Sequence, residues 1–207
     1  MTEKKNIDGE IFHNTIKILK NLIKFQTVSG KPNLKLIEYC ENELKKSGAK
    51  SFKTFNASKT QANLFATIEG ENSIDKGIVL SGHTDVVPAV ASEWTSNPYI
   101  ARDEDNKIYG RGSCDMKGFI ACTLAYAKIF KENNLDRDIH FCYTFDEETA
   151  CIGAPLLIKE LKKRNIKNGI CIIGEPTNMK IIDGHKGMNE YTIHFGGLAG
   201  HSSKPNK

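Results

Sequence analysis

Three short apolar runs in this sequence each lead directly into acidic or imidazole side chains, and no other feature constrains the fold as strongly. The runs are GIVLS at 77–81, IHFCYTF at 139–145 and GICIIG at 169–174. The residues that follow them are His83 and Asp85, then Asp146, Glu147 and Glu148, and finally Glu175. Runs of this length are typical of buried strands. Because ligands bind at the carboxyl ends of parallel strands in open α/β sheets, we expect these side chains to gather at one edge.

Segments with helical periodicity alternate with the apolar runs. The spacing predicts helices over 11–25, 34–46, 116–130 and 155–163. Further strands are expected at 51–55 and 63–69, with a hairpin around Asp105 and Asn106. Alternation of this kind predicts an α/β fold with a mostly parallel sheet flanked by helices. With 207 residues and 39% hydrophobic content, the chain is long enough for one sizeable core.

The character of the sequence changes near Ile181. HKGMNEYTIHFGGLAGHSS at 185–203 has alternating apolar residues, several glycines and no helical pattern. We therefore expect one domain over 1–180, and the beginning of a smaller α+β domain over 181–207. The second domain is expected to be incomplete, because the sequence stops soon after this stretch.

Composition excludes several classes of protein. The net charge of +4 comes from lysines scattered along the chain, without a basic block, which argues against nucleic-acid binding. The N-terminal MTEKKNIDGE lacks the apolar core of a signal peptide, and no run reaches the roughly 18 apolar residues of a membrane span. The six cysteines form no C-x-x-C pair, so neither a zinc ribbon nor a redox motif is predicted. A cytoplasmic enzyme is the expectation.

One histidine and several carboxylates at a single sheet edge predict a metal site suited to Zn²⁺, and acceptable to Co²⁺ or Mn²⁺. His83 and Asp85 are two apart in extended backbone, so Asp85 can accept one imidazole N–H and leave the other nitrogen for metal. Glu147 and Glu148 are adjacent and point in different directions, so one can bind metal while the other acts as a general base. Asp115 lies in the glycine-rich turn GRGSCDMKG, just before a helix.

Other interpretations stay open for each motif taken singly. An isolated H-x-D is commonly a turn, and an EE pair after a strand is commonly a solvated loop. The spacing of GRGSCDMKG departs from the dinucleotide-binding G-x-G-x-x-G. Ser81, Ser113 and Cys114 are potential nucleophiles, but the sequence suggests no base paired with them. A non-catalytic binding module would have no need for a base such as Glu147, so an enzyme is favoured.

Taken together, the motifs resemble the M20 family of metallopeptidases and deacylases. They occur in the family's order and cover essentially the whole chain. The matching segments are SGHTDVVP at 81–88, Trp94 with NPY at 97–99, YGRGSCDMKGF at 109–119, FDEET at 145–149, GEPT at 174–177, HKG at 185–187 and GHSSKP at 200–205. The resemblance implies a zinc-exopeptidase-like catalytic domain followed by a lid and dimerisation domain, in a protein that forms a homodimer.

The resemblance also implies a set of metal ligands. His83, Asp115 and Glu175 would bind one metal ion, and Asp115 would bridge to a second ion held also by Glu148. The peptide bond after the bridging aspartate is often cis in this family, so a cis bond is expected between Asp115 and Met116. Family members supply a further histidine to the second ion from beyond the lid. The chain as given is therefore expected to bind at most one metal ion tightly and to have little activity.

The same resemblance implies catalytic roles and a substrate class. Asp85 would orient His83, Glu147 would be the base and proton shuttle, and His201 of the lid would hold the substrate carbonyl oxygen across the dimer. The substrate would be a small N-acyl amino acid. HKG and GHSSKP favour N-acetylornithine, and hence arginine biosynthesis. Succinyl-diaminopimelate and the substrates of other aminoacylases or dipeptidases of the family remain alternatives.

Overall fold

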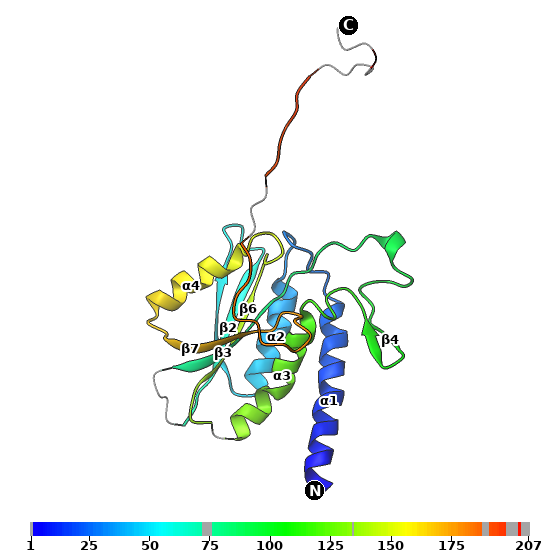
Figure 1. Ribbon diagram of the computed structural model, residues 1–207. Coiled ribbons are helices and arrows are strands. Elements are labelled where there is room, and N and C mark those ends of the chain that lie inside the picture. Colours follow the sequence, from blue (N-terminus) through cyan, green and yellow to red (C-terminus); the bar gives the residue numbers. More distant parts are fainter. Residues whose placement is uncertain (1, 72–75, 134, 188–190, 198–202, 204–207) are drawn as a thin grey trace. The chain divides into compact units, whose positions relative to one another are not determined.

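The computed structural model of the chain describes residues 2–71, 76–133, 135–187, 191–197 and 203 (Figure 1). It divides into two units, Met1–Pro176 and Thr177–Lys207. The helices and strands all belong to the first unit. They are α1 (Thr2–Ile23), α2 (Leu34–Lys46), β1 (Lys50–Phe55), β2 (Ala62–Ile68), β3 (Gly77–His83), the short 3₁₀ helix η1 (Ala91–Glu93), β4 (Arg102–Glu104), β5 (Lys107–Tyr109), α3 (Lys117–Glu132), β6 (Ile139–Thr144), α4 (Gly153–Lys163) and β7 (Asn168–Ile173).

Five strands form the central sheet in the order β1-β2-β6-β3-β7. Strand β3 pairs in parallel with both β6 and β7, whereas β2 is antiparallel to β1 and to β6. Within this sheet, all strands except β2 therefore run in one direction, which confirms the predicted α/β class with a mostly parallel sheet. The carboxyl ends of β3, β6 and β7 consequently lie side by side at one edge.

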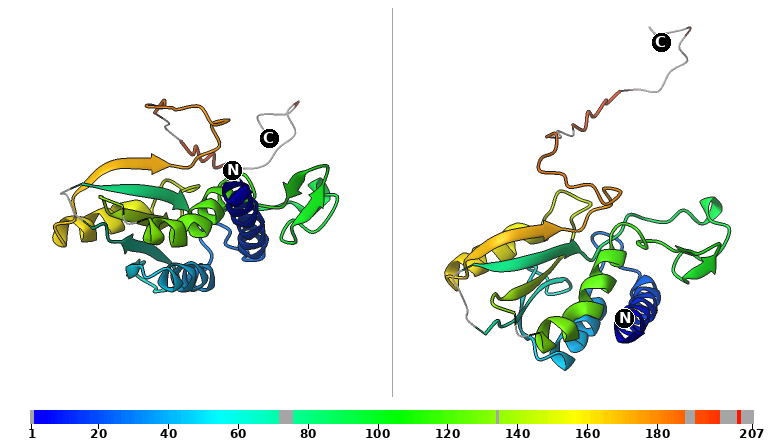
Figure 2. Two further views of the ribbon diagram at one scale, coloured as in Figure 1. Left: turned by 90° about the horizontal axis from the view of Figure 1, so that it is seen from below. Right: turned by 60° about the horizontal axis from the view of Figure 1, so that its bottom comes forward.

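Helices cover both faces of this sheet (Figures 1 and 2). Leu64 and Ala66 of β2 face a buried core shared with α1, α2 and α3, while Phe65 between them faces a smaller core that includes Leu157 of α4. This alternation follows from the two-residue period of a strand. Burial on both faces explains why the central strands read as nearly continuous apolar runs.

Most expected elements are found within one or two residues of the predicted bounds, and α1 differs most. It begins at Thr2, well before the predicted start at residue 11. Residues 8–10 are exposed, so they carry no apolar periodicity that could reveal the helix. The expected hairpin is present as β4 and β5, with Asp105 and Asn106 at positive φ values of 49° and 58° in its turn. A two-residue turn with this backbone matches the twist of paired strands.

The second unit, Thr177–Lys207, begins with a turn in which Lys180 donates its N–H to the Thr177 carbonyl oxygen over 3.2 Å. Its described residues contain no helix or strand. The interpretation of this region as the start of a lid domain stays a prediction. Across the described part of the whole chain, none of the helices is both long and apolar enough to cross a membrane.

Candidate metal centre

The sheet edge brings together most of the residues that the sequence singled out. His83 is the last residue of β3, and the segment Glu147–Glu148 follows β6. Glu175 follows β7, and Asp115 lies just before α3. Because β3 pairs in parallel with both β6 and β7, the segments that follow these strands lie at one edge, as the sequence predicts. All these residues belong to the first unit.

Close packing at Gly82 positions His83 against the start of α3. A Cβ atom at Gly82 would lie 3.0 Å from the Met116 Cε atom, so the missing side chain leaves room for this methionine. Met116 is fully buried, and its sulfur accepts the His83 backbone N–H over 3.2 Å. The expected cis peptide bond between Asp115 and Met116 is confirmed.

Glu175 reaches the same edge through another close approach. Gly174 donates its N–H to the Ser81 carbonyl oxygen over 3.1 Å, which continues the pairing of β7 with β3. The Phe119 ring of α3 packs directly on Gly174, where a Cβ atom would overlap the ring. Only glycine therefore allows β7 to carry Glu175 this close to α3.

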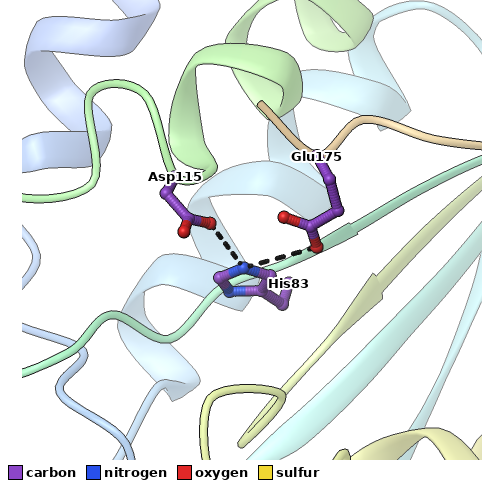
Figure 3. Close-up of side chains that lie close together, drawn as sticks. All are labelled: His83, Asp115 and Glu175. Atoms are coloured by element: carbon purple, nitrogen blue, oxygen red, sulfur yellow. Dashed lines mark hydrogen bonds and ion pairs between the residues drawn. The ribbon is translucent and has the colours of Figure 1, made fainter. Parts of the chain in front are cut away.

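Three side chains converge on one point, with His83 facing Asp115 and Glu175 (Figure 3). The His83 Nε2 atom lies 3.0 Å from Asp115 Oδ1 and 3.8 Å from Glu175 Oε1. One potential ligand atom from each of the three residues lies within 4.8 Å of the others. The imidazole is almost fully buried, whereas the two carboxylates are partly open to solvent.

The donor set fits a divalent metal ion. Zinc binds imidazole nitrogen and carboxylate oxygen at about 2.1 Å, so ligand atoms in a tetrahedral site lie about 3.4 Å apart. The distances from His83 Nε2 to Asp115 and Glu175 lie on either side of this value. Within the described residues, neither carboxylate forms an ion pair with a lysine or arginine side chain, so both remain available as ligands for a cation.

The pKa values in this group reflect burial and the concentration of negative charge. Burial alone would lower the pKa of His83, but its contact with Asp85 and the negative charges of Glu175 and Glu147 raise it to about 9. Burial, together with the charge of Asp115, raises the pKa of Glu175 above its ordinary value. A proton and a metal ion would compete for His83 Nε2, because a metal ion binds only the unprotonated nitrogen.

Asp85 contacts His83 as expected, but through a different atom. His83 Nδ1 donates to the backbone carbonyl oxygen of Asp85 over 2.9 Å, while the nearer carboxylate oxygen is 3.6 Å away. The carboxylate instead accepts the backbone N–H groups of Glu147 and Glu148, over 3.0 Å and 3.2 Å. Asp85 thus orients the imidazole with its main chain and the two glutamates with its side chain.

The two glutamates take different positions around this group. Glu147 Oε2 lies 3.9 Å from His83 Nε2, and its Oε1 contacts the Cys151 Sγ atom at 3.6 Å. Glu148 is not part of the convergent group of three. Burial and the nearby charge of Asp115 raise the pKa of Glu148. His201, the predicted lid residue, lies outside the described residues.

The nucleophile alternative finds no support in these contacts. The two ring nitrogens of His83 face Asp85 and Asp115, so this imidazole is not directed at Ser81, Ser113 or Cys114. His140 points elsewhere, because its Nδ1 atom lies 2.9 Å from the Thr67 hydroxyl on the neighbouring strand.

Sequence reasoning missed several residues that hold this site. Ser29 and Gly30, in the loop between α1 and α2, contact Asp85 and Asp146 respectively. Gln61 also donates to Asp146, over 2.7 Å. The sequence marks Asp146 only as one of three acidic residues after a strand. Ser29 and Gln61 carried no local signal, because their contacts are distant in the sequence.

A separate cavity of about 520 Å³ lies at the other end of the sheet, where β3 and β6 begin. Its lining includes Lys50, Glu69, Gly77 and His140, and none of the proposed metal ligands. Lys50 and Glu69, which both line it, form an ion pair at 2.6 Å. The candidate metal centre is therefore identified by its chemistry and not by the size of a cavity.

The chain is similar in sequence to two kinds of curated protein. A succinyl-diaminopimelate desuccinylase of Rickettsia typhi is 38% identical over 203 residues, covering 91% of this chain and 52% of that protein. An acetylornithine deacetylase of Buchnera aphidicola subsp. Acyrthosiphon pisum is 33% identical over 198 residues, covering 92% and 50%. The chain spans about half the length of these curated relatives.

Solved structures show the same fold. Human carnosine dipeptidase 1 matches with a TM-score of 0.67 at 22% identity, over 82% of this chain and 39% of that chain. An M20 family metallo-carboxypeptidase from Sulfolobus solfataricus matches with a TM-score of 0.67 at 24% identity, over 77% and 37%. Residues 79–203, which contain every proposed site residue, match the peptidase family M20/M25/M40. This chain belongs to that family.

Proposed function

We propose that the protein is a metal-dependent amidohydrolase that removes the acyl group from a small N-acyl amino acid. The observation that carries the proposal is the convergence of His83, Asp115 and Glu175, with Glu147 beside them. In this proposal the three residues hold one divalent ion, with zinc as the first candidate and cobalt as an alternative. Asp115 and Glu148 together contribute to a second ion.

An ion held here would act as a Lewis acid that polarises the substrate carbonyl and makes an attacking water molecule more acidic. Glu147 is the general base, because its partly exposed carboxylate lies near the ligand group and carries no ion pair with a lysine or arginine in the described part of the chain. It takes the proton of the attacking water and delivers it to the leaving amine. His83 is kept in one orientation by the Asp85 main chain.

Residues of the second unit suggest which substrate the enzyme hydrolyses and how the substrate carbonyl is held. The motifs HKG at 185–187 and GHSSKP at 200–205 favour N-acetylornithine as the substrate. The relatives named desuccinylase, at 38% identity, favour succinyl-diaminopimelate as the second candidate. In both cases His201 would donate a hydrogen bond to the oxyanion that forms from the carbonyl. A homodimer would bring this histidine to the partner's metal centre.

The test is a panel assay of the protein that carries this sequence. N-acetylornithine, succinyl-diaminopimelate and dipeptides are each offered with added Zn²⁺ or Co²⁺, and the Glu147→Ala variant is assayed in parallel. We expect hydrolysis of one acyl amino acid and a fall in kcat of about 100-fold or more in the variant, the usual contribution of a general base. Unchanged turnover in the variant would contradict the role of Glu147. Binding of the acyl amino acid without turnover would instead indicate a binding module.

A further inference from the structure

The loop between α1 and α2 is fastened directly to the chain that follows β3. We call residues Thr27–Gly30 the brace loop. Val86 donates its N–H to the Thr27 carbonyl oxygen over 3.0 Å, and Ser29 donates its N–H to the Val86 carbonyl oxygen over 3.2 Å. Val28 and Val86 form a parallel β-bridge. The backbone of the brace loop is therefore fixed beside Asp85 independently of any side chain.

Ser29 adds a contact to the side chain of Asp85. Its hydroxyl donates to Asp85 Oδ2 over 2.7 Å, and the same oxygen accepts the Glu148 N–H. The other oxygen, Oδ1, accepts the Glu147 N–H. The Asp85 side chain is only 3% exposed, so water has little access to replace a lost donor. In the described residues, no lysine or arginine forms an ion pair with it.

The next residue, Gly30, contacts the turn that contains the two glutamates. We call Asp146, Glu147 and Glu148 the acidic turn. Gly30 donates its N–H to Asp146 Oδ1 over 2.8 Å, and Gln61 donates to the same oxygen. Asp146 is 5% exposed and has a positive φ of 53°, a conformation that surrounding contacts must hold. The brace loop thus holds the acidic turn at Asp146 directly, and at Glu147 and Glu148 through Asp85.

We propose that Ser29 is a positioning residue of the metal centre. Its hydroxyl fixes the Asp85 carboxylate in the orientation that holds the Glu147 and Glu148 backbone, while the Asp85 main chain orients His83. This inference rests on the proposed function, because it assigns Ser29 to the same site. Ser29 does not touch the convergent group itself, so it acts only through Asp85. Outer partners of this kind tune metal affinity because they fix the orientation of the ligands.

The test compares the variants Ser29→Ala, Ser29→Thr and Ser51→Ala in the 207-residue chain. Ser51 is the matched control, since its hydroxyl also donates to a largely buried carboxylate, that of Glu41, over 2.8 Å. That contact lies on α2 and β1, away from the proposed ligands. Both alanine variants lose one serine-to-carboxylate hydrogen bond. Only Ser29→Ala is expected to affect the metal centre.

The first measurement is Zn²⁺ affinity by competition with a coloured chelator. We expect Ser29→Ala to weaken Zn²⁺ binding about tenfold, at the low end of the range for outer partners of metal ligands. Ser29→Thr keeps the hydroxyl and should stay within about twofold of the unsubstituted chain, and so should Ser51→Ala. Equal weakening in both alanine variants would assign the effect to general stability and overturn the proposal.

The second measurement needs no metal ion. Hydrogen exchange of the Glu147 and Glu148 backbone amides is followed by NMR in the metal-free chain. We expect Ser29→Ala to speed exchange at these two amides about tenfold, which corresponds to the loss of roughly one net hydrogen bond, while Ser51→Ala leaves them unchanged. Unchanged exchange in Ser29→Ala would overturn the proposal. Absence of Zn²⁺ binding in the unsubstituted chain would count against the proposed function alone, because amide exchange still decides the role of Ser29.

The Ser29→Cys variant provides a second route if Ser29→Ala folds poorly. Cysteine is close to serine in size, and its thiol is a weaker hydrogen-bond donor. Its amide exchange should fall between those of the unsubstituted chain and Ser29→Ala. A value equal to that of the unsubstituted chain would contradict the role of the hydroxyl.

Discussion

Gly174 positions a proposed metal ligand by the absence of a side chain. The Phe119 ring occupies the place where a Cβ atom would lie, and the next residue is Glu175. We expect Gly174→Ala to lower the free energy of unfolding by about 1–3 kcal/mol, the usual cost of inserting a methyl group into a packed site. Because Phe119 or β7 must shift, Zn²⁺ affinity should fall as well.

Chemical denaturation and Zn²⁺ competition measure these two effects. Gly184→Ala is the control, because a Cβ atom at Gly184 meets nothing within 4 Å. It should change neither quantity. A Gly174→Ala variant as stable as the unsubstituted chain would show that the contact with Phe119 is not restrictive.

Some contacts of single residues cannot be predicted from the sequence. The spacing of His83 and Asp85 predicts that they lie together, but it cannot tell which acceptor atom of Asp85 faces the imidazole. The sequence does not single out Lys117, yet this residue is fully buried, and burial lowers its pKa to about 8. It donates to the Leu22 and Phe25 carbonyl oxygens at the end of α1. Helix ends leave such carbonyls unpaired, and only the folded chain shows which distant side chain reaches them.

At the scale of elements, a cluster around Glu41 joins α2 to β1. Its carboxylate, on a side chain only 10% exposed, accepts hydrogen bonds from Ser51 and Lys53 of β1. Burial would raise the pKa of Glu41, but its hydrogen bonds with Lys53, Ser51 and Lys45 lower it to about 2. Because the folded pKa lies below the unfolded value of about 4.3, the stabilisation is present above pH 4.3 and is lost as the pH falls towards 2.

We therefore expect Glu41 to contribute about 1–3 kcal/mol near pH 5, as hydrogen bonds to charged groups do, and to lose this contribution by about pH 2. Urea unfolding of the chain and of Glu41→Gln across this range measures it. The difference in unfolding free energy between the two should shrink as the pH falls. Substitution of the exposed Glu10 by Gln is the control. A difference that does not change with pH would rule out an ionised Glu41 as the source.

Elements were the part of the structure that the sequence predicted best. The apolar runs of β3, β6 and β7 and the helical spacing of α2, α3 and α4 are local patterns, and they placed these elements within a few residues. The parallel order then predicted which side chains share an edge. The brace loop was missed because its hydrogen bonds to Asp85 and Asp146 join segments far apart in the sequence. No periodicity encodes such contacts.

At the scale of the whole molecule, the first unit places the proposed site residues at the carboxyl edge of one sheet and packs helices on both faces. The family match over residues 79–203 and the fold shared with other M20 structures agree with this arrangement. The proposed chemistry depends on one property of this arrangement, which is that it brings the metal ligands together. Side chains from three separate segments must share a single ion, although His83, Asp115 and Glu175 are far apart in the sequence.

The most direct test of that property is a Zn²⁺ titration of the chain and of the variants His83→Ala, Asp115→Asn and Glu175→Gln. The control is His13→Ala, which removes an exposed histidine of α1. Loss of a direct ligand should weaken binding by about 100-fold or more, at least as much as loss of an outer partner. We predict this weakening for each of the three variants and unchanged Zn²⁺ binding for His13→Ala. Zn²⁺ binding of unchanged strength in all three variants would contradict the shared metal site.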